Sequence, residues 1–433
     1  MTAVDDLGEF DPRSDEVMQC PYPHYSKLRA EGGVEEMPGE YVGRSGQRVF
    51  AVSRYDLVAE VIGDWRTYSS KFGTPGALPP PHLAEQLREI ASHGVSRAPT
   101  MLTADPPVHT RYRRLVSKAF TARRVAELGP TVREICEGLV DEFAVGEVDL
   151  IPSYCVPIPT KTVAAALGVP QERCSDFKRW ADASVAAIGR QLDDQAWIDS
   201  AKGVVELQQF FAAELEERRQ HPADDLLTDL LAVRLTPEDG IDGEPLSTAE
   251  LISIVQQLQV AGSETTASLI ADAVVLLHGR PDQWQRLVDE PESAVAIVEE
   301  CLRLSSPNLG MFRIATSDTT LGGVDIPKGS TLWVMFGSAN RDEVVFGDDA
   351  AIFRAGRSES HIAFGKGVHF CVGAPLARLE AVVALQVLAR RFSEVRPVDP
   401  DSLQYAPSCI LRGLTSLPVE LVPRTEGRHG VMK

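Results

Sequence analysis

The sequence predicts a mainly α-helical protein with small β-sheets, folded as a single large domain over residues 1–433. Three observations predict this class. Helical periodicity dominates residues 122–233 and returns in a long capped stretch from Ser247, strand-like runs are short, and no segment has the composition of a linker. Hydrophobic residues make up 44% and charged residues 24%, the balance of a chain that buries a large core. We expect residues 1–20 to be a poorly ordered lead-in.

Charge and cysteine usage limit the possible partners and the compartment. A formal net charge of -19 disfavours nucleic acid and anionic membrane surfaces. The 7 cysteines are odd in number and follow no spacing pattern, which is typical of reduced thiols in the cytoplasm. The acidic N-terminus lacks signal-peptide features, and no window approaches the ~18 to 20 apolar residues of a membrane span. We therefore expect a cytoplasmic monomer without a membrane anchor.

The N-terminal part alternates helix, strand and loop signals. A helix is predicted at Pro21–Arg29 and another at Tyr55–Gly63. Between them, Val49–Ser53 has strand character and follows a turn-rich segment, Gly43–Gly46, which indicates a small hairpin. The glycines and prolines of residues 73–100 break regular structure, so a surface loop is expected there.

Two basic residues mark the helix that follows Asp105. His109 and Arg113 are one turn apart and share a face, so together they can hold one carboxylate. A surface ion pair is the alternative interpretation.

A long helix begins in the capping box Ser247-Thr-Ala-Glu250 and ends near Leu277, with Gly279 as its C-cap. About 31 residues at ~1.5 Å each give ~46 Å, enough to cross the molecule. Its middle, Ala261-Gly262-Ser-Glu264-Thr265-Thr266, places small and polar residues in an otherwise apolar helix. Core helices rarely bury a carboxylate without cause, small residues let a flat cofactor approach, and a threonine bonded to a carbonyl opens the helix to water.

Downstream, a carboxylate and a guanidinium lie at i, i+3 in Glu300-Cys-Leu-Arg303, where they can pair. Arg313 then opens strand-like turns that continue through 321–329 and 331–335. Its alternative is a solvated charge at a strand edge. An irregular meander over 340–354 leads to the next motif, and 410–414 is predicted as a terminal hairpin.

The segment Phe364-Gly-Lys-Gly-Val-His-Phe-Cys371-Val-Gly373 presents one cysteine on a glycine-rich loop. We expect its glycines, Gly365, Gly367 and Gly373, to serve unusual backbone angles or close backbone approach. A helix follows to about Phe392, with Pro375 in its first turn, and a helix N-terminus favours a thiolate. No second cysteine or histidine has zinc or cluster spacing, and a sole thiolate suits haem iron. A buried, inert thiol is the alternative.

The pattern Phe364-Gly365-x-Gly367-x-His369-x-Cys371-x-Gly373 resembles the haem-binding signature of the cytochrome P450 family. The other motifs follow in that family's order over roughly residues 100–380. The resemblance implies the cytochrome P450 fold and haem b. It also implies Cys371 as the iron ligand, Glu264 and Thr265 as the proton relay, His109, Arg113, Arg313 and His369 at the haem propionates, Ala261, Gly262, Phe364, Gly365 and Gly373 as further haem contacts, and Glu300 and Arg303 as a structural pair.

The resemblance further implies a haem-thiolate monooxygenase of the soluble bacterial type, which inserts one atom of O2 into a hydrophobic small molecule by hydroxylation or epoxidation. Because the chain has no flavin or nicotinamide fingerprint, electrons from NAD(P)H are expected through a ferredoxin reductase and a ferredoxin. We hypothesise that the ferredoxin docks near Lys366, Arg114 and Lys118. Leu309, Gly310, Met311, Ile410 and the 73–100 loop are predicted to line the substrate pocket, roofed by parts of 176–205; ordinary core packing is their alternative.

Two other functions stay open. One is a peroxide-driven haem peroxygenase, which the Glu264-Thr265 pair disfavours because such relatives generally lack it. The other is a haem-binding sensor or carrier without oxygenase activity. Fatty acids, terpenoids, steroids and polyketide-type molecules all remain possible substrates.

Overall fold

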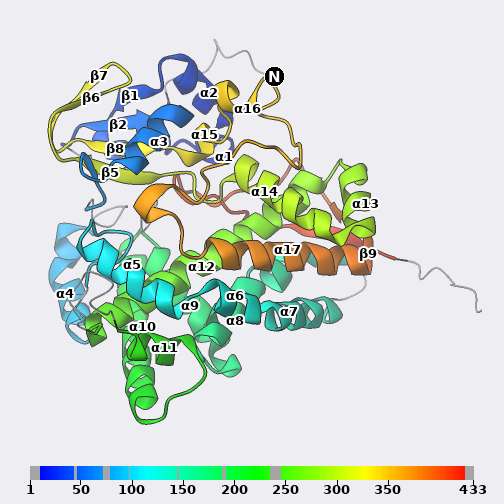
Figure 1. Cartoon of the computed structure of the whole chain (residues 1–433), viewed down its shortest axis with the longest axis horizontal. Coiled ribbons are helices and arrows are strands. Elements are labelled where there is room, and N and C mark those ends of the chain that lie inside the picture. Colours follow the sequence, from blue (N-terminus) through cyan, green and yellow to red (C-terminus); the bar gives the residue numbers. More distant parts are fainter. Residues whose placement is uncertain are drawn as a thin grey trace, which may run out of the picture.

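The computed structural model describes residues 10–42, 46–71, 79–96, 98–143, 146–187, 192–234 and 245–424. Helices predominate and lie mostly below and across the middle of Figure 1. They are α1 (Asp15–Gln19), α2 (Tyr22–Ala30), α3 (Tyr55–Gly63), α4 (Ala84–Ser92), α5 (Val108–Ala119), α6 (Ala122–Glu127), α7 (Gly129–Asp141), α8 (Pro157–Ala166), α9 (Cys174–Val185), α10 (Asp194–Gln220), α11 (Leu226–Ala232), α12 (Thr248–Leu277), α13 (Pro281–Asp289), α14 (Ala294–Ser305), α15 (Phe336–Ala339), α16 (Glu343–Phe346) and α17 (Ala374–Arg391).

The strands form small sheets, as predicted. They are β1 (Val34–Met37), β2 (Val49–Val52), β3 (Tyr68–Ser69), β4 (Glu147–Asp149), β5 (Met311–Ala315), β6 (Thr319–Leu321), β7 (Val324–Ile326), β8 (Thr331–Val334), β9 (Phe392–Pro397) and β10 (Pro418–Pro423). The largest sheet has the order β1-β2-β8-β5-β3, and only the β2–β8 pair in it is parallel. It lies at the top of Figure 1 with α2, α3 and α15.

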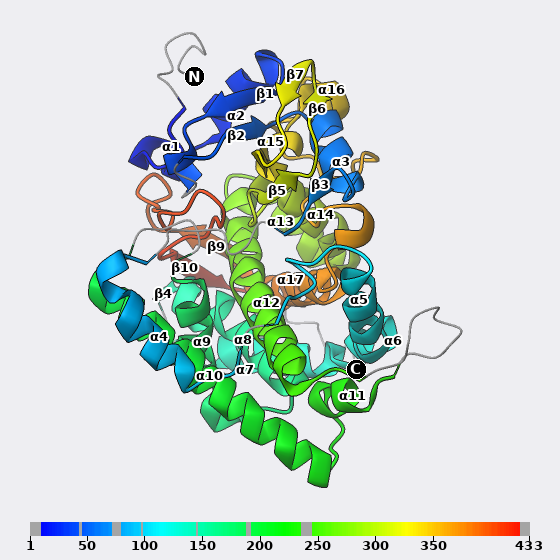
Figure 2. The same ribbon diagram turned by 90° about the vertical axis from the view of Figure 1, so that its left-hand side faces the viewer.

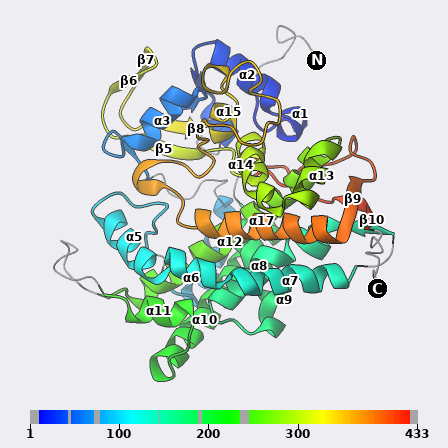
Figure 3. The ribbon, with the colours of Figure 1, turned by 45° about the vertical axis from the view of Figure 1, so that its right-hand side comes forward.

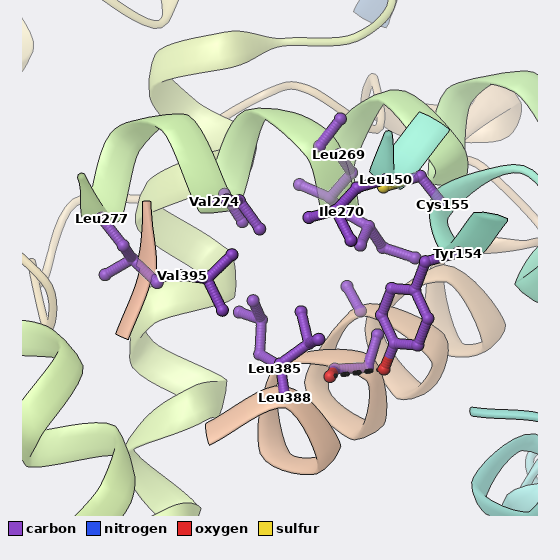
Figure 4. Close-up of a cluster of buried hydrophobic side chains, with 14 of the residues drawn as sticks. Leu150, Tyr154, Cys155, Leu269, Ile270, Val274, Leu277, Leu385, Leu388 and Val395 are labelled. Carbon is purple, nitrogen blue, oxygen red and sulfur yellow. Dashed lines mark hydrogen bonds between the residues drawn. The ribbon is translucent and has the colours of Figure 1, made fainter. Parts of the chain in front are cut away.

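Helix α12 runs through the centre of the molecule, and α17 crosses it (Figures 1 and 2). One large cluster of buried side chains joins the C-terminal half of α12 to α17, α14 and α7. Figure 4 shows part of it, where Leu269, Ile270 and Val274 of α12 face Leu385 and Leu388 of α17. Tyr154 closes its edge by donating its hydroxyl hydrogen to the Ala384 carbonyl at 2.9 Å. A second cluster packs the N-terminal half of α12 against α8, α9 and α10.

Helix α12 begins and ends where the sequence predicts. Ser247 Oγ accepts from the Glu250 backbone N–H at 3.3 Å and the Glu250 carboxylate accepts from the Ser247 N–H at 2.7 Å, which completes the capping box. After Leu277, Gly279 takes φ +74°, the left-handed conformation that ends a helix. The helix is long and apolar enough to cross a membrane, but 61% of its most apolar window is buried within the protein, as in the core helix of a globular domain.

Two expectations at the N-terminal side need correction. Residues 1–9 of the predicted poorly ordered lead-in lie outside the described ranges, but the rest of it contains α1. Gln19 at the end of α1 donates to the Tyr405 carbonyl and accepts from the Tyr405 N–H, at 3.0 and 2.8 Å. The predicted loop 73–100 contains α4, which packs on α10 although prolines precede it. Long-range contacts stabilise both segments, and local sequence does not reveal such contacts. Residues 43–45 of the predicted turn lie outside the described ranges, and its flanking strands β1 and β2 pair antiparallel.

Candidate active site

The cysteine loop has the backbone that its glycines suggest. Gly365 and Gly367 adopt φ +68° and +69°, a region that costs an L side chain strain. The Cys371 N–H donates to the Phe364 carbonyl at 2.9 Å, so the loop closes on itself just before α17. Gly373 is different, because its φ is -80°, and a Cβ added there would lie 3.8 Å from Cys371 Sγ. Its small size keeps the approach to the sulfur open.

Electrostatics at Cys371 combine opposing effects. Burial raises the pKa of the Cys371 thiol, while the backbone N–H groups of Gly373 and Ala374 and the charges of Arg113 and Arg378 act to lower it. The sequence predicts only the lowering by the helix N-terminus. The effect of burial on the pKa is larger than the opposing effect of these donors and charges, because moving a thiolate out of water costs more free energy than they supply.

Four predicted basic residues, His109, Arg113, Arg313 and His369, lie near one another beside this loop. The rings of His109 and His369 are 4.2 Å apart. His369 is hydrogen-bonded to Ser70 Oγ at 3.0 Å and to the Met101 carbonyl at 3.1 Å, and burial followed by the nearby Arg313 charge lowers its pKa to about 3. His109 is 2% exposed, and neither ring nitrogen has a hydrogen-bond partner in the part of the chain that the structure describes.

Arg313 is also buried, and burial lowers its pKa to about 10. Its side chain donates to the Phe312 carbonyl at 2.7 Å, and no described carboxylate forms a salt bridge with it. Arg113 donates to the Phe370 carbonyl at 2.6 Å, and burial lowers its pKa too. Buried cations are normally paired, so this group of cations and neutral histidines is suited to receive an anion.

Asp105 is a residue of this site that the motif search missed. Its carboxylate accepts from Ser69 Oγ at 2.5 Å and from the Ser70 N–H at 2.8 Å, and its charge opposes the lowering of the Arg313 pKa. These bonds tie β3 to the start of α5. Asp105 directly precedes two prolines, a pattern typical of the start of a helix, and this pattern is the sequence signal that marks its position.

The middle of α12 has a polar, partly open face. Ala261 is exposed although its helix crosses the core, and Thr265, one turn on, donates from Oγ1 to the Ala261 carbonyl at 2.8 Å. This is the threonine-to-carbonyl bond that the sequence predicts. Glu264 is half-buried. Gly262 points elsewhere: a Cβ there would lie 3.1 Å from Val163 Cγ2, so its size serves packing against α8.

The predicted pair Glu300 and Arg303 is a fully buried network. Arg303 donates to both carboxylate oxygens of Glu300 at 2.8 and 2.7 Å, and also to three carbonyls of the meander. Arg357, which the motif search missed, adds a donor to Glu300 at 3.2 Å. Arg357 lies in an irregular segment, so no helical or strand periodicity relates its position to that of Glu300. The network fixes the meander that leads into the cysteine loop.

A second missed network lies at the base of the loop. Arg378 donates to Glu299 at 2.6 and 2.9 Å and stacks over the Phe364 ring at 4.6 Å. Despite partial burial, hydrogen bonds from His361 and Arg378 lower the pKa of Glu299 to about 2. The pair therefore anchors both ends of the cysteine loop to α14.

The predicted pocket residues lie close together. Leu309 and Ile410 are 3% exposed and belong to one cluster of buried side chains, against which Met311 packs, and the Leu309 N–H donates to the Ile410 carbonyl at 2.7 Å. A Cβ on Gly310 would lie 2.4 Å from the Val334 carbonyl oxygen, so this glycine serves packing on β8. Met311 is half-buried and alternates with Phe312 along β5, on the face that also carries Arg313. The other three residues make the contacts of ordinary core packing.

The segments expected to cover the site are fastened to one another. The Val95 N–H donates to Gln208 of α10 at 2.9 Å, and Gln259 of α12 donates to the Phe177 carbonyl of α9 at 2.6 Å. Residues 72–78, 97 and 188–191 of these segments lie outside the described ranges.

Known proteins resemble this chain along nearly its whole length. The cytochrome P450 family profile matches residues 190–412. Cytochrome P450 107B1 of Saccharopolyspora erythraea is 37% identical, over 96% of this chain and 98% of its own. 6-Deoxyerythronolide B hydroxylase of the same species is 36% identical, over 97% and 100%. The structure of cytochrome P450 CYP109Q5 from Chondromyces apiculatus superposes with a TM-score of 0.81 at 34% identity, over 96% and 98%. The chain therefore belongs to the cytochrome P450 family, whose members bind haem, and it is a monooxygenase of the oxidoreductase class.

Proposed function

We propose that the protein is a ferredoxin-dependent haem-thiolate monooxygenase that inserts one atom of O2 into a hydrophobic small molecule, by hydroxylation or epoxidation. A relative named as a hydroxylase, 6-deoxyerythronolide B hydroxylase, supports hydroxylation. The Glu264-Thr265 pair favours O2 over peroxide as the oxidant.

One observation carries the proposal: buried groups beside the cysteine loop lack the partner that they need. Among the described residues, the nitrogens of His109 have no hydrogen-bond partner, and no carboxylate forms a salt bridge with the buried Arg313. An unsatisfied buried polar group costs ~1–3 kcal/mol, and a charged one costs more. The propionates of haem b are anions of the required kind, so the donor set fits that cofactor.

In this proposal Cys371 Sγ would ligate the iron, and His109, Arg113, Arg313 and His369 would hold the propionates. When bound, haem would supply the oxidising power, because a thiolate-bound iron activates O2. The exposed Ala261 would leave room against the backbone of α12.

The proton path follows from α12. Thr265 Oγ1 holds its hydrogen toward the Ala261 carbonyl at 2.8 Å, and the Glu264 carboxylate precedes it on the same turn. We assign Glu264 to take up protons and Thr265 Oγ1 to hold and orient them at the open face of α12.

The electron donor is proposed from surface charge. Lys366, Arg114 and Lys118 are exposed, and the neighbouring Val368 and Phe370 of the loop are 39% and 40% exposed. Cations around an apolar patch on a chain of net charge -19 favour an acidic redox protein such as a ferredoxin.

The test is the spectrum of the reduced, CO-bound holoenzyme. We expect the red-shifted band of thiolate ligation in the wild type, and its complete loss in Cys371→Ala. The matched control is Cys174→Ala, a partly buried thiol on α9 that should leave the band unchanged. A band that persists in Cys371→Ala would show that another residue binds iron. Turnover with a ferredoxin system against peroxide, with product detection, then separates the monooxygenase from a peroxygenase or a carrier.

A further inference from the structure

The N-terminal half of α12 leaves one face less buried than the rest. Its members recur every three or four residues, so they lie on one side of the helix. They are Ser253, Gln256, Gln257, Val260, Ala261, Glu264 and Thr265. The other faces pack into the two large clusters of buried side chains. The face therefore continues from the proposed proton relay toward the segments that cover the site.

Two polar residues on this face are satisfied by those covering segments. Ser253 Oγ accepts from the Ala98 N–H at 3.1 Å, and Gln256 donates to Ser184 Oγ of α9 at 3.1 Å. Gln257 is different. Its Oε1 is buried and has no hydrogen-bond partner among the described residues. It lies one turn before Ala261 and two turns before Thr265 on the same face.

Core packing does not explain why position 257 carries an amide side chain. Gln259, on the opposite side of the helix, also has an unbonded oxygen, but its nitrogen donates to the Phe177 carbonyl and the side chain is fully buried, so it joins α12 to α9. Gln257 makes no such link. A leucine would fill the same space without burying an unpaired oxygen, which indicates that Gln257 faces a polar group supplied from outside the chain.

We propose that Gln257 is a specificity-determining residue that hydrogen-bonds a polar group of the substrate. The substrate class is then an apolar molecule that carries a hydroxyl or carbonyl within reach of Gln257, which precedes Thr265 by eight residues, or ~12 Å along the helix axis at ~1.5 Å each. A primary amide both donates and accepts, so either group can be bound. The inference rests on the proposed function and adds that the hydrophobic substrate carries a polar group that Gln257 binds.

The experiment uses probes that are fixed at one end. An N-alkylimidazole binds haem iron through its nitrogen, so the start of its tail is fixed at the iron and its reach is set by chain length. For each chain length in a series, an alkyl tail is compared with the isosteric tail that ends in a hydroxyl, by optical titration of the haem-loaded enzyme. We expect the ratio of the two Kd values, alkyl over hydroxyalkyl, to fall about tenfold in Gln257→Leu at the best chain length, equivalent to ~1.4 kcal/mol.

Gln256→Leu is the matched control, since its amide already bonds Ser184, and it should keep the wild-type ratio. Gln257→Met retains the side-chain length without the amide and should show the same fall in the Kd ratio as Gln257→Leu. Agreement between the two variants shows that the fall does not come from misfolding of one of them. Without ligand, Gln256→Leu should lower the melting temperature and Gln257→Leu should not. An unchanged Kd ratio in both Gln257 variants would overturn the inference while leaving the proposed function intact. The absence of any nitrogen-ligand spectrum in the wild type would overturn both.

Discussion

At the scale of single residues, burial rather than residue type separates functional groups from structural ones. Glu300 and Arg303 are as buried as His109 and Arg313, but every charge in the first pair has a partner within the chain. Among the described residues, His109 has no hydrogen-bond partner for its ring nitrogens, and Arg313 forms no salt bridge with a carboxylate. The sequence identifies all four residues. Only the tertiary structure distinguishes the pair whose charges are neutralised within the chain from the pair that can receive an anion.

Glu380 of α17 provides a prediction at this scale. It is buried against Thr162 and Thr266, and burial raises its pKa to about 8. A raised pKa means that the folded state binds the proton more tightly, so this contribution to stability is complete below the ordinary glutamate pKa and is lost as the pH rises through about 8. Between pH 5 and 9 it should cost the wild type about 4 kcal/mol of unfolding free energy, measured by urea denaturation.

Glu380→Gln, which keeps a neutral donor, should lose most of that pH dependence. The exposed Glu31→Gln serves as its control and should follow the wild type. Equal pH slopes in all three proteins would contradict a protonated Glu380.

At the scale of elements, the start of α12 also positions α5. Glu250 completes the capping box, and it also accepts from Arg111 at 2.7 Å and from the Tyr112 hydroxyl at 2.9 Å. Because α5 carries His109 and Arg113, one carboxylate connects the helix of the proposed proton relay to the helix of the proposed propionate site.

Two substitutions separate these tasks. Ser247→Ala removes only the cap and should cost about 1 kcal/mol of unfolding free energy. Glu250→Ala also removes the carboxylate that accepts from Arg111 and Tyr112, so it should cost about 3 kcal/mol and hasten haem release. Urea denaturation and the rate of haem transfer to apomyoglobin measure the two effects. Equal costs for the two variants would show that the α5 contacts add nothing.

At the scale of the whole molecule, net charge and local charge oppose each other. The chain is strongly acidic, yet Lys366, Arg114 and Lys118 expose cations near the cysteine loop. A uniformly acidic surface would repel an acidic ferredoxin, so docking requires such a local patch.

Reversal of these three charges to glutamate should slow reduction by ferredoxin about tenfold or more at low salt, and the difference should shrink as salt is added. Stopped-flow reduction of the CO complex measures it. Lys328→Glu, an exposed position in the turn before β8, is the control and should behave as wild type. Unchanged rates and unchanged salt dependence in the triple variant would refute this docking site.

The sequence by itself determined what is encoded locally: the mainly α class, the capped helix α12, the positive-φ glycines before Cys371, and the pairing of Glu300 with Arg303. Each depends on residues close together in the chain. Tertiary structure decided the rest. It placed Leu309, Gly310 and Ile410 in core packing, turned Gly262 toward α8, and ordered α4 against α10. It also left Gln257 Oε1 without a hydrogen-bond partner among the described residues. These outcomes depend on contacts between segments far apart in sequence, and the free energy of such contacts cannot be deduced from local pattern.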